Sequence, residues 1–172
     1  MNSAEEASII NHQRHLPPSD RYGQAYRDEI IKNAEQTQLG LLTTWDLFKL
    51  LRNAEKLGWP TEVVLPIFYR VGRIDPIPEH YIEVGRILEV WQPAFGINPT
   101  QPITIGHRIA VEIGDTFDEF NLTSLRVDEN ESQTAPVGSN CGVKYDDPST
   151  RLRKGARVFL VNHAAMPREK QP

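Results

Sequence analysis

The chain has few of the residues that build a covalent or metal-based framework. Its 172 residues include one cysteine, Cys141, so no internal disulfide can form and no zinc ligand set can be assembled around that thiol. No apolar run approaches the roughly 20 residues that a transmembrane helix needs, and the N-terminus has no signal-peptide hydrophobic region. We therefore expect a cytoplasmic protein that makes no contact with a membrane, with Cys141 as a buried structural thiol.

The chain also lacks a surplus of positive charge. Its net charge is −4, with 24 % charged and 39 % hydrophobic residues, a composition typical of a globular protein. A protein that binds nucleic acid without sequence preference normally carries a basic surplus, because phosphate neutralisation supplies its affinity. The overall charge therefore argues against an extensive surface of that kind.

Common catalytic motifs are missing as well. The sequence contains no G-x-x-x-x-G-K-[S/T], G-x-G-x-x-G, G-x-S-x-G or H-E-x-x-H pattern. Asp115, Asp118 and Glu119 cluster after Gly114, but without a neighbouring base or nucleophile we interpret them as a solvated acidic turn. We expect no complete active site, no catalytic residue, no metal and no cofactor in this chain.

The clearest structural signal is the segment from Leu39 to Trp59. A short apolar strand runs into an amphipathic helix, for which Thr43 or Thr44 provides the N-cap and Asp46 places a negative charge in the first turn. Gly58 occupies the position of a C-terminal cap. The helix presents an apolar stripe, which we expect to face the core. It contains Trp45, Phe48 and Leu51, widened by Leu47, Leu50, Ala54 and Leu57.

The other N-terminal elements are shorter. A helix is predicted from about Gln24 to Thr37, and another from Glu62 to about Val71, which Pro66 must distort or shorten. Only two strands can be recognised, near Ile9–Ile10 and near Leu41–Leu42. Because two strands cannot cover three apolar helix faces, we expect residues 1–74 to be an incomplete α/β fragment. It would need a protein partner or self-association.

The hydrophobic period changes from about 3.6 to 2 after a proline-rich linker at residues 75–79. Short alternating runs separated by Gly, Pro and Asn/Asp turns predict a small antiparallel β-barrel, closed or nearly closed, over residues 80–162. Residues 163–172 are expected to be a disordered tail. The predicted fold class is therefore α+β. The barrel positions expected to be mostly buried are Val84, Leu88, Ile109, Val111, Val143, Val158 and Leu160.

Four motifs between Ile9 and Ile74 form a recognisable set. They are Asn11 with Arg14, Pro17-Pro18-Ser19-Asp20-Arg21, Leu41-Leu42-Thr43-Thr44-Trp45-Asp46-Leu47-Phe48, and Val71-Gly72-Arg73-Ile74. The set resembles the C-terminal half of a restriction-endonuclease-like domain found in bacterial proteins. In that family an acidic residue and an acidic-x-Lys pair hold a divalent metal and a water, on strands preceding the matched part. This chain contains neither Glu-x-Lys nor Asp-x-Lys, so the resemblance implies no catalysis by this chain alone.

Five further motifs occur between His80 and Asn162. They are Ile105-Gly106-His107-Arg108-Ile109, Ser124-Leu125-Arg126-Val127, Ala135-Pro136-Val137-Gly138, Cys141-Gly142-Val143-Lys144 and Leu152-Arg153-Lys154-Gly155-Ala156-Arg157-Val158. This part resembles the β-barrel second domain of translation elongation factors, and a similar barrel occurs at the end of some collagenase-like peptidases. His107 stands where the family usually has an acidic residue. The resemblance implies a fold and specifies no substrate.

Two groups of residues are candidates for binding nucleic acid. Asn11, Arg14 and His15, together with His12, follow a strand end and could meet phosphate, or His12 and His15 could hold a metal, although no third ligand is evident. The alternative is a polar loop before the next helix. The second group is Arg151, Arg153, Lys154 and Arg157. These cations form either a phosphate-contacting edge or a solvated hairpin that Asp146 and Asp147 partly neutralise.

Three function classes follow from these observations. The favoured one is a non-catalytic nucleic-acid-associated or protein-interaction module derived from a nuclease-like protein. The first alternative is the C-terminal part of a metal-dependent nuclease whose catalytic half is on another polypeptide. The second is a translation- or tRNA-associated β-barrel protein.

Overall fold

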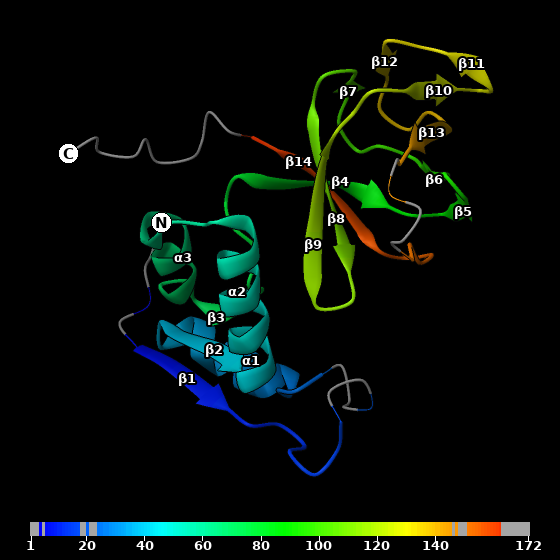
Figure 1. The fold of residues 1–172 in the computed structure, drawn as a ribbon. Helices are drawn as coiled ribbons and strands as arrows, with labels where there is room; N and C mark the ends of the chain where they lie inside the picture. The colour runs from blue at the N-terminus through cyan, green and yellow to red at the C-terminus, as the bar shows by residue number, and fades with distance from the viewer. Residues whose placement is uncertain are drawn as a thin grey trace. The chain divides into compact units, whose positions relative to one another are not determined.

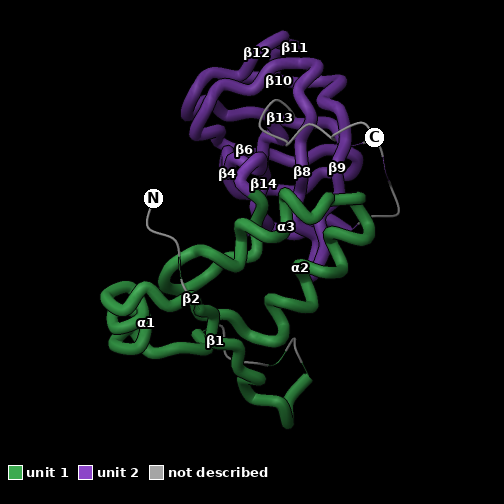
Figure 2. The backbone as a smooth tube through the Cα atoms, turned by 90° about the vertical axis from the view of Figure 1, so that its left-hand side faces the viewer, with its two compact units in different colours: residues 1–78, 167–172 green, residues 79–166 purple. Residues whose placement is uncertain are grey.

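The computed structural model describes residues 4, 6–17, 20, 24–145, 147 and 151–162. Two predicted features lie outside these residues: the tail at residues 163–172, and Asp146, which was expected to help neutralise the cationic hairpin. The chain divides into two compact units between Pro78 and Glu79 (Figure 2). We call residues 1–78 unit 1 and residues 79–166 unit 2, and describe each by itself. The chain is α+β, with helices in unit 1 and antiparallel sheets in unit 2 (Figure 1).

Unit 1 contains a parallel sheet of three strands with the order β1-β2-β3. The elements, in chain order, are β1 (Glu6–Ile10), α1 (Asp28–Gln36), β2 (Leu39–Thr43), α2 (Thr44–Leu57), α3 (Thr61–Phe68) and β3 (Gly72–Arg73). Because β2 is the central strand and both its faces are covered, four of its five residues are buried. Tyr26, Ala34 and Leu41 form the core on the face that α1 covers. The helices α2 and α3 lie over the opposite face (Figure 1), where Leu50 and Ile67 are fully buried.

The prediction of two strands in this unit was wrong. The strand β1 is five residues long and pairs in parallel with the whole of β2, and β3 adds a third strand through Gly40–Gly72 and Leu41–Arg73. A strand of two residues gives no period-2 pattern, which is why the sequence did not show it. The first helix begins at Asp28 instead of Gln24, because Arg27 has extended backbone angles.

The helix α2 begins and ends where its capping residues predict. Thr43 is the N-cap of a capping box with Asp46, and Gly58 closes the helix in the left-handed conformation with φ of 66°. Its predicted apolar stripe faces the core only in part: Leu50 is fully buried, while Trp45, Leu47, Ala54 and Leu57 are half-buried. Phe48 and Leu51 are 46 % and 55 % exposed. The buried positions of the helix are Asp46, Leu50 and Asn53.

Unit 2 consists of three antiparallel sheets that share one core. The sheet orders are β11-β10-β13-β6-β5, β12-β7 and β4-β14-β8-β9. Buried side chains from all three sheets meet in one cluster that includes Val84, Phe95, Ile103, Ile109, Val143 and Val158. The strands are β4 (Tyr81–Arg86), β5 (Glu89–Trp91), β6 (Ala94–Ile97), β7 (Ile103–Thr104), β8 (Arg108–Ile113), β9 (Thr116–Asn121), β10 (Leu125–Val127), β11 (Asn130–Glu131), β12 (Thr134–Ala135), β13 (Cys141–Lys144) and β14 (Arg157–Val161).

The strand pairings do not close unit 2 into a barrel within the described residues. The burial prediction holds for Val84, Ile109, Val111, Val143 and Val158, while Leu160 is partly buried. It was wrong for Leu88, which is 41 % exposed; Ile87 is buried in its place. Gly85 explains the change, because its φ of +150° and the close approach of Asn98 O interrupt the alternation before the strand ends. On the paired strand β14, Val158 lies opposite Gly85, and the register shifts by a β-bulge between Val158 and Phe159.

Candidate functional site

The carboxyl ends of the three parallel strands form one edge of the sheet in unit 1, where α/β proteins commonly place their sites. Asn11 follows β1, Thr43 ends β2 and Arg73 ends β3. The first two strand ends are linked directly, since Thr44 Oγ1 donates a hydrogen bond of 3.2 Å to Asn11 Oδ1. This edge is the first candidate site.

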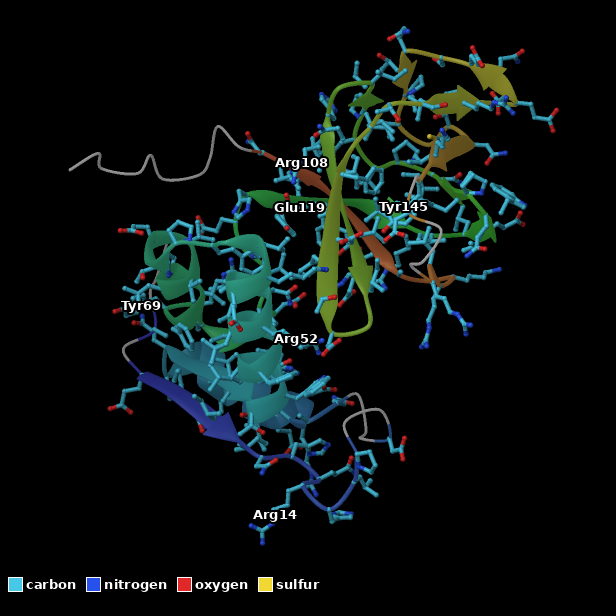
Figure 3. The ribbon with its side chains drawn as sticks, in the orientation of Figure 1. Arg14, Arg52, Tyr69, Arg108, Glu119 and Tyr145 are labelled. Carbon is cyan, nitrogen blue, oxygen red and sulfur yellow. The ribbon has the colours of Figure 1, made fainter. Side chains whose placement is uncertain are left out.

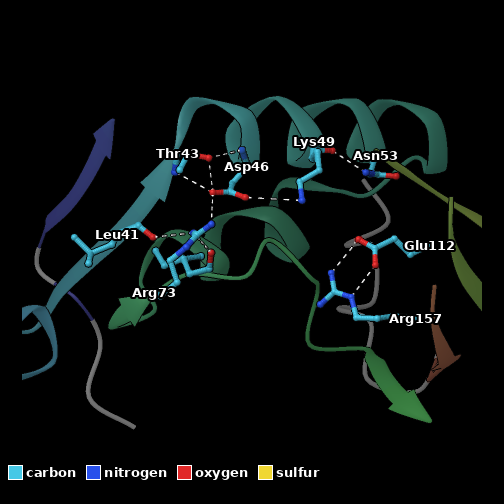
Figure 4. A network of polar contacts seen from close by, with 9 residues as sticks. Leu41, Thr43, Asp46, Lys49, Asn53, Arg73, Glu112 and Arg157 are labelled. Carbon is cyan, nitrogen blue, oxygen red and sulfur yellow. Dashed lines mark hydrogen bonds and ion pairs between the residues drawn. The ribbon is translucent and has the colours of Figure 1, made fainter. Parts of the chain in front are cut away.

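Asp46 is the centre of the polar contacts at this edge (Figure 4). Its Oδ2 accepts hydrogen bonds from the Thr43 backbone N–H at 2.9 Å, from Thr43 Oγ1 at 2.6 Å and from Arg73 Nη2 at 2.6 Å. Lys49 Nζ lies 3.8 Å from the other carboxylate oxygen. The Asp46 side chain is only 6 % exposed, so these donors replace the water that the charge has lost. We call Thr43, Asp46 and Arg73 the sheet-end network.

Arg73 joins this network to the strands. Its Nη1 donates to the carbonyl oxygens of Ile74 at 2.6 Å and Leu41 at 3.3 Å. Its guanidinium carbon lies 6.0 Å from the centre of the Tyr26 ring, and Tyr26 Oη donates to Leu42 O at 2.6 Å. Burial raises the pKa of the Tyr26 hydroxyl, and the Asp46 carboxylate also raises it, whereas the Arg73 charge acts in the opposite direction.

These contacts give the sheet-end network a structural role. Asp46 and Arg73 bind each other and the adjacent backbone, so the Arg73 side chain has little donor capacity left for a bound phosphate. No group of three His, Cys, Asp or Glu side chains in the described part of the chain could hold a metal ion. The network therefore ties the ends of β2 and β3 to the start of α2, and the Thr44–Asn11 hydrogen bond adds the end of β1.

The other predicted residues of this edge do not extend the network. Arg14 is exposed on the loop after β1 (Figure 3). His15 is exposed as well, and His12 is half-buried. Of the first predicted group, the structure brings only Asn11 to the start of α2.

The second candidate site is a hollow of about 710 Å³ in unit 2. Three of the four predicted cations line it, namely Arg151, Arg153 and Lys154. They share it with Glu112, Ile113, Gly114 and Ala156. All three cationic side chains are exposed, and none of them makes an ion pair within the described ranges. We call this cavity the basic hollow.

Arg157, the fourth predicted cation, is bound to Glu112, the one acidic residue among the described residues of the lining. Its Nε donates to Glu112 Oε2 at 2.8 Å, and its Nη2 donates to Glu112 Oε1 at 3.0 Å (Figure 4). This two-pronged contact is the geometry in which guanidinium and carboxylate match best. The side chains are 16 % and 23 % exposed. The basic hollow therefore presents three available cations and one acid that is already neutralised.

The acidic cluster after Gly114 differs from the predicted solvated turn. Arg108 Nε donates to Glu119 Oε2 at 2.6 Å (both residues are labelled in Figure 3), and Glu119 also accepts from the Tyr81 hydroxyl. Asp118 accepts from the Tyr145 hydroxyl. The strand β9 places these two carboxylates on opposite faces, where each is used in packing. They form no acid/base pair.

Glu112 is a residue of the candidate site that was not predicted from the sequence. It becomes part of the hollow because β8 and β14 pair antiparallel with Val111 opposite Val158, which places Glu112 opposite Arg157. These residues are 45 positions apart. No local sequence pattern predicts such a register.

Comparisons with known proteins identify no family. No protein-family model matches the chain, and no curated protein matches its sequence. Among solved structures, the chain is similar to the C-terminal domain of a putative U32 peptidase of Geobacillus thermoleovorans, in two crystal structures. The TM-score is 0.40 in both, with 11 % and 10 % identity, covering 45 % and 46 % of this chain and 96 % and 91 % of that domain. A similarity this low supports no inference about function.

Proposed function

We propose that the chain is a non-catalytic, nucleic-acid-associated module, and that the basic hollow contacts the phosphate backbone. The observation that supports this most directly is the gathering of Arg151, Arg153 and Lys154 around one cavity, with no ion pair among the described residues. Like charges repel one another, so three exposed cations at one cavity favour an anion that neutralises them together.

The lining also suggests what kind of contact the site makes. Among its described residues it contains no aromatic side chain on which a base could stack, and the apolar ones are Ile113, Gly114 and Ala156. Base stacking is the usual source of affinity for unpaired bases. We therefore expect binding through the backbone, with little sequence preference. The net charge of −4 implies a short contact, so the salt dependence of binding should correspond to only a few phosphates.

The test is fluorescence anisotropy of a labelled single-stranded oligonucleotide of about 12 nucleotides, titrated at low salt. The test variant is Arg151→Gln/Arg153→Gln/Lys154→Gln. The control is Arg27→Gln/Lys32→Gln/Arg126→Gln, which removes the same charge from positions outside the hollow. We expect at least a tenfold loss for the test variant and less than about a twofold loss for the control. Equal losses, or no binding by the natural chain, would overturn the proposal.

The non-catalytic part of the proposal has its own assay. The oligonucleotide should stay intact in the presence of Mg²⁺ or Mn²⁺, since the chain has no acidic-x-Lys pair to hold a metal and activate water. Metal-dependent cleavage that follows the protein through purification and disappears with EDTA would contradict it.

A second candidate function is association through unit 1 with a protein partner or a second copy. Phe48 and Leu51 are exposed on the outer face of α2, and Ile30 of α1 is 46 % exposed. Trp45 stacks on Phe48 with ring centres 5.1 Å apart. We call Trp45, Phe48 and Leu51 the α2 outer face. Neighbouring apolar side chains that remain exposed are typical of an interaction surface.

Two narrower proposals rest on the family resemblances. A separately encoded catalytic half could complete unit 1, whose strand β1 has no partner on its outer edge in the described chain. Alternatively, unit 2 could be translation- or tRNA-associated. A companion reading frame encoding the missing strands, with co-purification of its product, would favour the first; co-purification with ribosomes or tRNA would favour the second.

A further inference from the structure

We propose that Arg157 is a positioning residue that keeps the basic hollow receptive to anions by neutralising Glu112, and that it does not itself contact the ligand. This inference rests on the proposed function of the hollow. It separates Arg157 from Arg151, Arg153 and Lys154, although all four are close in the sequence.

The Arg157 side chain is already engaged by other groups of the protein. Both prongs of its guanidinium donate to the two oxygens of Glu112. Its guanidinium carbon also lies 5.6 Å from the centre of the Phe159 ring, which is on the same face of β14. Binding a phosphate through this side chain would require it to leave a two-pronged partner and an aromatic face.

Glu112 would oppose anion binding if Arg157 were absent. Its carboxylate belongs to the lining that also contains Arg151, Arg153 and Lys154. A free carboxylate there would either pair with one of those cations or repel an incoming phosphate. Both effects lower affinity. Arg157 prevents them because it occupies both carboxylate oxygens.

Two single substitutions should therefore have effects of opposite sign. Arg157→Gln should weaken oligonucleotide binding by about fivefold, because it exposes the Glu112 charge. Glu112→Gln should tighten binding by about threefold, because it removes the acid that belongs to the described lining. The effect of Arg157→Gln should then shrink to less than about twofold when Glu112 is already replaced by Gln.

The experiment is this double-mutant cycle, measured by the anisotropy titration described above. Thermal unfolding of each variant shows whether it is folded. If Arg157→Gln does not fold, Arg157→Lys takes its place, because lysine keeps the charge but loses the two-pronged contact. Partial retention of binding by Arg157→Lys is the expected result. Weaker binding by Glu112→Gln, or the same loss on removing Arg157 with and without Glu112, would overturn the inference.

The outcome also separates this inference from the function on which it rests. If the natural chain binds and the Arg151/Arg153/Lys154 variant does not, while the cycle is additive, only the role of Arg157 is wrong. If the natural chain binds no oligonucleotide, or the Arg151/Arg153/Lys154 variant binds as well as the natural chain, the proposed function and the inference both fail.

Discussion

The two units use polar side chains in different ways. Unit 1 buries the charged Asp46 at the end of its sheet and leaves apolar side chains such as Phe48 and Leu51 exposed. Unit 2 encloses an apolar core with three sheets and keeps Arg151, Arg153 and Lys154 at the surface. Unit 1 therefore adds a buried polar network to its apolar core, whereas unit 2 has exposed cations available for binding.

This difference predicts where each unit is vulnerable. A buried charge is tolerated only while its partners are present, so the loss of one member is costly. A close-packed apolar core instead loses stability in proportion to the volume removed. Substitutions in the sheet-end network should destabilise unit 1 alone, and changes to exposed cations of unit 2 should affect binding without affecting folding.

The largest effect is expected for Asp46→Ala. It removes the N-terminal capping box of α2 and leaves Arg73 without its carboxylate partner. We expect a loss of about 3 kcal/mol in the free energy of unfolding of unit 1, at the low end of the range for a fully buried pair because the Arg73 side chain is 32 % exposed. Hydrogen exchange read by mass spectrometry should show faster exchange in β2, α2 and β3.

The control for this substitution is Glu55→Ala on the exposed side of the same helix, which should change stability by less than about 0.5 kcal/mol. Equal acceleration of exchange in both units would contradict the separation of the two units. A loss below about 1 kcal/mol would show that the network is not the main support of unit 1.

The second-largest effect is a loss of stability at alkaline pH, which should differ between the two units. Burial raises the pKa of the Cys141 thiol from 9.0 to about 11. The folded state therefore holds this proton more tightly than the unfolded state, so its contribution is complete below about pH 9 and is lost as the pH rises through about 11. We expect unit 2 to lose about 2 kcal/mol between about pH 8 and pH 11 from this group.

Cys141→Ala should remove this pH dependence, at the cost of a small cavity at all pH values. The quantity to compare is the difference in unfolding free energy between the two pH values for each protein, measured with urea. Tyr26 in unit 1 has a pKa raised above 10.0. Its ionisation should therefore also lower the stability of unit 1 as the pH rises, but this loss begins at a higher pH than the loss from Cys141. Identical pH dependence in the natural protein and the Cys141→Ala variant would show that the thiol is not the titrating group.

The smallest effect on stability is expected on the α2 outer face. Phe48→Ser/Leu51→Ser removes two half-exposed side chains, so the free energy of unfolding should change by no more than about 0.5 kcal/mol per site. If this face mediates self-association, light scattering over a concentration range from low to high micromolar should show a larger particle for the natural chain and a monomer for the variant. A natural chain that stays monomeric throughout would remove self-association from the possible roles of this face.

The sequence predicts the local elements better than it predicts their partners. Thr43, Asp46 and Gly58 set the ends of α2 through interactions within a few residues, and these ends are where the sequence places them. The orientation of α2 could not be predicted in this way, because Arg73, 27 residues away, holds Asp46 inside and thereby turns Phe48 outward. Hydrophobic periodicity alone assigns Phe48 to the core.

The same distinction applies to unit 2. Alternation identifies Ile109, Val111 and Val158 as core positions, because side-chain direction follows from the strand itself. Whether the sheets close depends on interruptions such as Gly85 and on long-range register. The grouping of Arg151, Arg153 and Lys154 could be predicted, but the pairing of Glu112 with Arg157 depends on how β8 meets β14.

The most direct test of the proposed function is the salt dependence of oligonucleotide binding. For a single strand, the logarithm of the binding constant falls with the logarithm of salt concentration by about 0.7 for each phosphate neutralised. Three contacts from Arg151, Arg153 and Lys154 predict a slope of about −2 for the natural chain. Replacing these three residues with Gln should bring the slope close to zero, while the Arg27/Lys32/Arg126 control keeps it. A slope that is the same in the natural chain and the Arg151/Arg153/Lys154 variant would contradict a phosphate-contacting role for the basic hollow.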